Sequence, residues 1–367
     1  METKAKERNI GFEVMRIVSM LLIILLHSID HSGVYENLAA GSALYYIEHF
    51  FYAAVQVCVN SFVLISGYFL VTSEFKPKKL ISLWFEVVFY SAAIKIILML
   101  LGEIEFSVTS LASCFVPILT GRYWFITIYF GMYLLSPFFN IAINAMNKKQ
   151  HRLLIIILFV LFSCMVSIHP SLKGMSSNGG WGLAWFTVLY FTAAYFRLHY
   201  EPSGKTFPAL AAFFVCPVLM IAALWVSNFS GSTMLKAIVE NWFRYDSVFA
   251  VIASVALLIV FVNSKIKCGK GMKKILVSLS ASTFAVYLIH AHANICTPEM
   301  WQRIGMVKFM SNWWYPLYQL AVVIMIFAAC VIIDKARIAL FKLIKLDKLA
   351  ETMGNGISRL IGRFTAQ

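Results

Sequence analysis

Residues 10–30 read IGFEVMRIVSMLLIILLHSID, an apolar run long enough for a helix to cross the hydrocarbon core of a bilayer. Similar runs recur along the whole chain. They do not alternate polar and apolar residues as the strands of a membrane barrel do, so each predicts a helix. The sequence therefore predicts an all-α integral membrane protein, a bundle of about ten transmembrane helices. The predicted spans are 11–29, 47–71, 80–101, 123–145, 153–169, 181–199, 207–226, 245–263, 277–297 and 315–335.

The composition excludes a soluble domain. Hydrophobic residues make up 60% of the 367 residues and charged residues only 13%, about half of the usual share in soluble proteins. The net charge of +14 comes from short loops between apolar runs, so we expect no nucleic-acid partner. The seven cysteines include no CxxC pair, so neither a metal site nor a disulfide framework is predicted.

The loop charges predict an orientation. With the N-terminus inside, 23 of the 31 Lys and Arg residues fall in inner segments and six in outer loops, as the positive-inside rule requires. Both termini are then cytoplasmic, in the inner cell membrane. We expect the first run to be retained rather than cleaved as a signal, because it contains Arg16. Residues 1–336 form the predicted membrane domain, and residues 337–367 form an amphipathic basic tail on the inner leaflet.

The first run carries the best candidate site. Arg16 and His27 are eleven residues apart, so both face the same side of a helix, ~16 Å apart along its axis. Glu13 and Asp30 extend this stripe. One hypothesis makes it catalytic: Arg16 holds an anion or a carbonyl group, His27 is a general base, and Asp30 sets its tautomer. The alternative is that Arg16 snorkels inward, His27 caps the helix and Asp30 is an ordinary loop acid.

Candidate binding residues lie near the inner face. Ser66 precedes a glycine at the end of the second run, where it either contacts substrate or lets two helices pack closely. Lys76 and Lys79 follow it. They bind the phosphates of a cytosolic donor, or they serve only as a topology signal.

Two further groups lie towards the outer face. Arg122, Tyr123 and Trp124 open the fourth span, where they contact a carbohydrate or an anion, or anchor the helix at the interface. Tyr287 and His290 share a polar stripe with Thr283 in the ninth span, and this stripe either packs or takes part in catalysis.

Four motifs together resemble the bacterial membrane acyltransferases of the acyltransferase-3 type, which O-acetylate surface polysaccharides. Arg16 and His27 match the Arg-ten-residues-His motif of the first helix. The other three matching segments are Ser66-Gly67-Tyr68-Phe69, Tyr123-Trp124-Phe125 with Leu134-Leu135-Ser136-Pro137, and Thr283 to His290. In some members of the family an Arg-x-x-Arg pair follows the second helix, where this chain has lysines.

The resemblance implies transfer of an acyl group, usually acetyl, from acetyl-CoA as co-substrate to a sugar hydroxyl across the membrane. The implied acceptor is a cell-surface polysaccharide, an exopolysaccharide or a lipid-linked sugar. Membrane lipids are the other expected partner, and no bound cofactor is expected. A secondary transporter, a flippase-like carrier or a sensor domain is the alternative, since each can use intramembrane charges.

Overall fold

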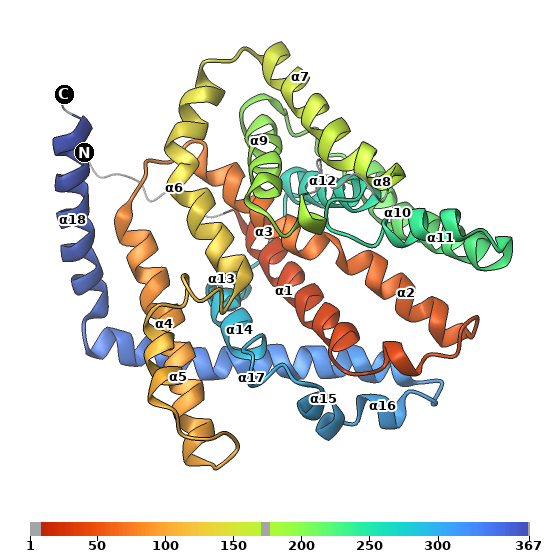
Figure 1. The fold of residues 1–367 in the computed structure, drawn as a ribbon. Coiled ribbons are helices and arrows are strands. Elements are labelled where there is room, and N and C mark those ends of the chain that lie inside the picture. The colour runs from red at the N-terminus through yellow and green to blue at the C-terminus, as the bar shows by residue number, and fades with distance from the viewer. Residues whose placement is uncertain (1–8, 170–176, 366–367) are drawn as a thin grey trace.

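The computed structural model describes residues 9–169 and 177–365, and all regular structure in them is helical. Figure 1 shows the bundle. The helices are α1 Ile10–Asp30, α2 Ala43–Val55, α3 Val57–Leu70, α4 Pro77–Leu100, α5 Val108–Ala112, α6 Trp124–Asn144, α7 Lys148–Phe159, α8 Met165–Ile168, α9 Leu183–His199, α10 Phe207–Ser230, α11 Thr233–Glu240, α12 Val248–Asn263, α13 Lys270–Ala281, α14 Thr283–His290, α15 Pro298–Ile304, α16 Met306–Phe309, α17 Tyr315–Leu343 and α18 Leu346–Thr365.

The described residues contain eight helical segments that are long and apolar enough to cross a membrane. They overlap eight of the ten predicted runs, and the ninth run lies at Lys270–His290 where 277–297 was predicted. The remaining runs, 181–199 and 245–263, form α9 and α12, which have 17 and 16 residues and are shorter than a typical span. The protein is therefore a multi-pass membrane protein built from helices.

Helix α1 lies inside the bundle and is touched by α2, α3, α12, α13, α14 and α17 (Figure 1). Asn9 begins it by accepting a hydrogen bond from the backbone N–H of Gly11. Apolar residues occur on every side of α1, so it can pack against neighbours all round. The stripe from Glu13 to Asp30 is thereby held by a rigid, well-supported element.

The Ser66-Gly67 pair in α3 lies where this helix packs against α9. A Cβ atom at Gly67 would lie 3.0 Å from the Cα of Tyr190 and 3.0 Å from the Cβ of Ala193, so α3 and α9 can approach this closely only at glycine. The hypothesis that this pair lets two helices pack closely therefore applies to Gly67. Ser66, the residue before it, faces a different side of α3.

Gly67→Ala is expected to destabilise the protein by ~1–3 kcal/mol, because the added methyl group must push two packed backbones apart. The measurement is thermal unfolding of the purified protein in detergent. Gly131→Ala in α6 is the matched control, since its added Cβ would lie 3.5 Å from Leu183, an ordinary contact. Equal melting temperatures for the two variants would contradict the close α3–α9 contact.

The C-terminal segment departs from the predicted boundary. Helix α17 continues to Leu343, so a division at residue 336 falls inside a helix. The chain then turns at Lys345, whose φ is +55°, and α18 runs across the end of α17 along α4 (Figure 1). Gly354 allows this packing, because a Cβ there would lie 2.8 Å from the backbone nitrogen of Lys78. Lys78 also forms an ion pair of 2.9 Å with Glu351.

The ninth predicted span is divided. Helices α13 and α14 meet at Ser282, and α14 ends at His290 rather than continuing to 297. The second predicted span is divided in the same way, since α2 and α3 meet at Gln56. Both divisions lie close to the site described next.

Candidate active site

A cavity of about 830 Å³ follows α1 along its length. Its lining includes Asn9 at the first turn of α1 and His31 just past the last. These residues are separated by ~33 Å along the helix axis, about the thickness of a hydrocarbon core. Residues from α3, α4, α6, α9, α13 and α14 complete the wall.

All four residues of the predicted stripe line this cavity: Glu13, Arg16, His27 and Asp30. Near the start of α1, the Nη1 of Arg16 lies 3.1 Å from the Oε2 of Glu13. The guanidinium group also lies over the ring of Phe69, 5.8 Å from its centroid. The side chain of Arg16 is 29% exposed, so it can also reach a ligand in the cavity.

His27 lies near the other end of the cavity, between two more histidines. The ring centroids of His290 and His31 are 5.1 Å and 5.4 Å from that of His27. No described residue forms a hydrogen bond with the buried Nδ1 of His27. Asp30, predicted to set the tautomer, does not contact Nδ1 here, and its side chain is exposed towards the cavity. Burial lowers the pKa of His31, which favours its neutral form.

The orientation of His290 is fixed by its own helix. Its Nδ1 lies 2.6 Å from the backbone oxygen of Val286. A carbonyl oxygen can only accept, so Nδ1 carries the proton and Nε2 is an acceptor. That Nε2 is buried and has no partner among the described residues. The neighbouring rings of His27 and His290 thus each have one buried nitrogen that lacks a partner.

Three more predicted residues line the cavity: Ser66, Trp124 and Tyr287. The hydroxyl of Ser66 donates to the backbone oxygen of Phe62 at 2.8 Å. Trp124 stacks on Trp181, with ring centroids 4.4 Å apart. The structure therefore brings together residues from α1, α3, α6 and α14 that the sequence analysis identified separately.

The other predicted binding residues do not line the cavity: Lys76, Lys79, Arg122, Tyr123 and His290. The hydroxyl of Tyr123 donates to the backbone oxygen of Leu288 at 2.8 Å and ties α6 to α14. The guanidinium group of Arg122 donates to Ser113 at 2.7 Å. Lys76 and Lys79 lie at the start of α4, outside the lining.

Arg197, which the sequence analysis did not select, lines the cavity near the start of α1. It lies in the last turn of α9, and its guanidinium group is 5.1 Å from the ring centroid of Tyr68. No carboxylate among the described residues pairs with it. In the sequence it was counted only as an inner-face charge, and nothing local distinguished it from the lysines of the other inner loops.

A second cavity of about 340 Å³ adjoins the first. The two cavities share Asp30, Trp181 and Tyr245 in their linings. The part of the chain that the structure describes contains no cluster of three or more His, Cys, Asp or Glu residues able to hold a metal ion.

Comparison with known proteins identifies the family. A family model described as an acyltransferase domain matches residues 9–335, which include every helix from α1 to α16 and most of α17. No curated protein and no solved structure matches the chain. Because the match extends over most of the chain, the protein belongs to the acyltransferase 3 family.

Proposed function

We propose that the protein transfers an acyl group, most simply acetyl, from cytosolic acyl-CoA to a hydroxyl group of a surface sugar across the inner cell membrane. One observation carries the proposal. In a member of an acyltransferase family, a single cavity joins Arg16 near one end of a membrane-spanning helix to His27 near the other. The loop charges support an orientation with the Arg16 end at the cytoplasm.

The two key residues act on different parts of the donor. They are ~16 Å apart along α1, so an arginine side chain cannot contact a carbonyl group that lies beside His27. Arg16 therefore holds the polar portion of the CoA arm, and the extended arm presents the thioester at His27. Apolar residues line the cavity between them, among them Met20 and Ile23, which keeps water from the thioester.

The chemistry at His27 is general-base catalysis. His27 takes the proton of the sugar hydroxyl, and the hydroxyl oxygen bonds to the thioester carbon. The carbon–sulfur bond then breaks, and the proton passes to the leaving thiolate of CoA. The alternative sequence, in which His27 first accepts the acyl group and then passes it to the sugar, uses the same residues.

His290 positions His27 in this scheme. A small rotation can bring its acceptor Nε2 to the Nδ1–H of His27, since the ring centroids are only 5.1 Å apart. That bond would leave the His27 Nε2 free to act as the base. His290 takes the role that the sequence analysis gave to Asp30, and Asp30 remains available to the acceptor.

Arg197→Gln is expected to raise the KM for acyl-CoA about tenfold with little change in kcat, because a charge-assisted contact to the donor phosphates is lost. Steady-state kinetics with purified protein measures this. Lys149→Gln, an exposed change on the inner face, is the control. An unchanged KM in Arg197→Gln together with a raised KM in Lys76→Gln or Lys79→Gln would move the donor site to the start of α4.

The proposed function is tested in proteoliposomes with acetyl-CoA supplied on one side and an oligosaccharide acceptor on the other. Transfer predicts that the acetyl label becomes covalently attached to the sugar and that free CoA appears in equal amount. A transporter or flippase-like carrier would move a solute and leave acetyl-CoA intact. Intact acetyl-CoA over a range of neutral and acidic acceptors would overturn the proposal.

A further inference from the structure

We propose that the second cavity binds the sugar ring next to the acylated hydroxyl, and that it selects a neutral sugar over an acidic one. This inference rests on the proposed function and assigns its acceptor site. The cavity lies against the His27 end of the first and meets it at Asp30. Its volume of about 340 Å³ suits one ring rather than a long chain.

Aromatic rings form the walls of the second cavity. Tyr52 and Phe243 lie nearly parallel, at 16° to each other with centroids 6.1 Å apart. Trp181 and Tyr245 stand where the two cavities meet, with centroids 6.0 Å apart. Flat aromatic faces suit the apolar C–H faces of a sugar ring, and four of them around a small polar cavity are typical of a carbohydrate site rather than of a lipid-facing surface.

Polar groups form the rest of the lining. Arg244 has five N–H donors. Three of them are used within the protein: Nε and Nη2 donate to Asp246 at 3.1 and 2.9 Å, and Nη1 donates to Asn241 at 2.5 Å. Two N–H donors therefore remain for ligand oxygens. The carboxyl group of Asp30, which also lines the second cavity, can accept hydrogen bonds from ligand hydroxyls.

The charges explain the preference for a neutral sugar. Asp246 is buried and forms a bidentate pair with Arg244, so these two charges offset each other. Asp30 has no cation partner among the described residues. Among the described residues, Arg244 is the one cation in the lining of the second cavity, and Asp246 already offsets its charge. The carboxylate of an acidic sugar would therefore be buried there without a partner cation, which is costly.

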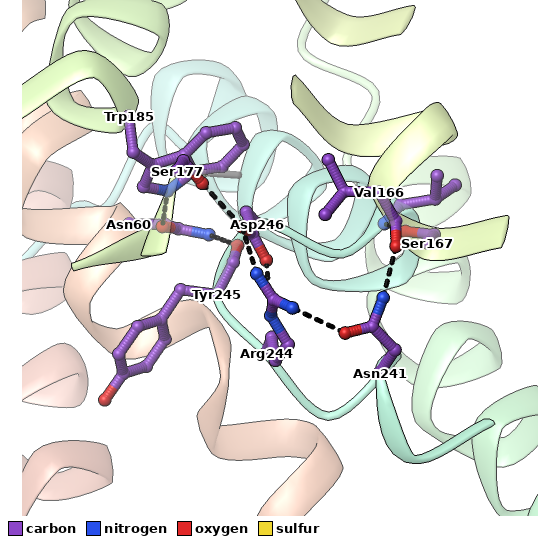
Figure 2. Close-up of polar contacts among 10 residues, drawn as sticks. Asn60, Val166, Ser167, Ser177, Trp185, Asn241, Arg244, Tyr245 and Asp246 are labelled. Atoms are coloured by element: carbon purple, nitrogen blue, oxygen red, sulfur yellow. Dashed lines mark hydrogen bonds and ion pairs between the residues drawn. The ribbon is translucent and has the colours of Figure 1, made fainter. Parts of the chain in front are cut away.

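A hydrogen-bond network holds the wall in place (Figure 2). Asn60 donates to the backbone oxygen of Tyr245 at 2.8 Å and accepts from the indole of Trp185 at 3.0 Å. Ser177 donates to Asp246 at 2.5 Å. Figure 2 shows how these contacts pin the segment that carries Arg244 and Tyr245. The wall is thus ordered before the sugar arrives, which lowers the entropy lost on binding.

The position of Asp30 connects this site to the chemistry. It follows His27 by three residues, less than one helical turn or ~4.5 Å along the axis. A hydroxyl of a ring held between Tyr52 and Trp181 can therefore project past Asp30 towards His27. The hydroxyl that becomes acylated is the one that points towards His27 when the ring is bound in the second cavity.

The first experiment measures binding without catalysis. Saturation-transfer NMR records binding of the methyl glycosides of glucose, galactose, mannose, N-acetylglucosamine and glucuronic acid to the full-length protein in nanodiscs. We expect a neutral glycoside to bind, the glucuronide to bind at least tenfold more weakly, and Phe243→Ala and Tyr52→Ala each to weaken the neutral ligand about tenfold. Trp313→Ala, an exposed aromatic outside both cavities, is the matched control. No binding of any neutral glycoside, or binding that survives both alanine variants, would overturn the proposal.

The second experiment separates this inference from the proposed function. Phe243→Ala is expected to raise the KM for the acceptor about tenfold and leave the slow hydrolysis of acetyl-CoA by water unchanged, since Phe243 does not line the donor cavity. Melting temperatures confirm that the variant is folded. An unchanged KM for the acceptor in Phe243→Ala would overturn the proposed sugar site and leave the proposed function standing. If the wild-type protein neither transfers the acetyl group of acetyl-CoA nor hydrolyses it, the proposed function is overturned. The binding experiment would still decide whether the second cavity holds a sugar.

Discussion

Replacing His27 by alanine is expected to lower the rate of acyl transfer by about 10²- to 10⁴-fold, the usual contribution of a general base. The side chain lies where the two cavities approach each other, and no other described histidine lines the first cavity except His31. Transfer from labelled acetyl-CoA to the acceptor measures the effect. The KM for the donor should change little, because the proposed site for the donor headgroup lies at the opposite end of α1.

His31→Ala is the matched control for this prediction. It removes an imidazole from the same cavity, 5.4 Å from His27, but one that follows the last residue of α1. We expect an effect below tenfold. Wild-type transfer by His27→Ala would exclude both the general base and an acyl-histidine, and a larger loss in His31→Ala would assign the base to that residue.

Arg16→Ala is expected to lower kcat/KM for acyl-CoA by about 10- to 100-fold, the loss associated with one charged hydrogen bond. Arg16→Lys should recover only part of this, since lysine lacks the planar fork that reaches Glu13 and a ligand together. Kinetics with a varied donor measures both variants. A change in the KM for the acceptor, with no change in the KM for the donor, would show that Arg16 contacts the acceptor and would contradict the prediction.

The control for this change is Arg303→Ala. That arginine pairs with Glu103 at 3.3 Å, is largely exposed and lies outside the cavity, so its loss should leave the kinetics unchanged. Equal losses in the two arginine variants would indicate a general effect on stability and not a donor contact.

The parts of the site that lie on one helix could be predicted from the sequence. Helical geometry alone places Arg16 and His27 on one face, and the cavity includes both. Tyr287 and His290 were also predicted to share one stripe. Tyr287 lines the cavity, and His290 lies beside the site without lining the cavity, its ring 5.1 Å from that of His27. Local period determines which side of a helix a residue occupies, so these predictions needed no knowledge of the fold.

The remaining parts depend on how distant segments meet. Asn60 and Tyr245 are 185 residues apart, and only the packed bundle brings them into contact. Arg197 resembles any inner-loop charge until α9 packs on α3. Lys76 and Lys79 do not line the cavity, because a basic stretch near the membrane indicates the inner side but not which side of α4 faces the cavity. Their binding of donor phosphates stays a prediction.

The second-cavity residues were missed for a related reason. Gly179 and Arg244 lie in segments between helices, where no period relates one residue to the next. Gly180 has a φ of +91°, and a Cβ there would lie 2.6 Å from the Cβ of Tyr245. A glycine pair in a loop is visible in the sequence, but the partner that requires it is not.

The eleven residues from Arg16 to His27 give α1 a fixed length of ~16 Å between these two side chains. In the proposed mechanism this spacing fixes the distance between the polar anchor of the donor and the reacting carbon, and a buried helix cannot stretch to adjust it. Only a donor with an arm of ~16 Å or more can occupy both ends at once. Short activated acyl compounds such as acetyl phosphate cannot, however reactive they are. Under the proposed function, the backbone of α1 therefore selects for a long-armed acyl carrier, in addition to the side chains proposed to contact the donor.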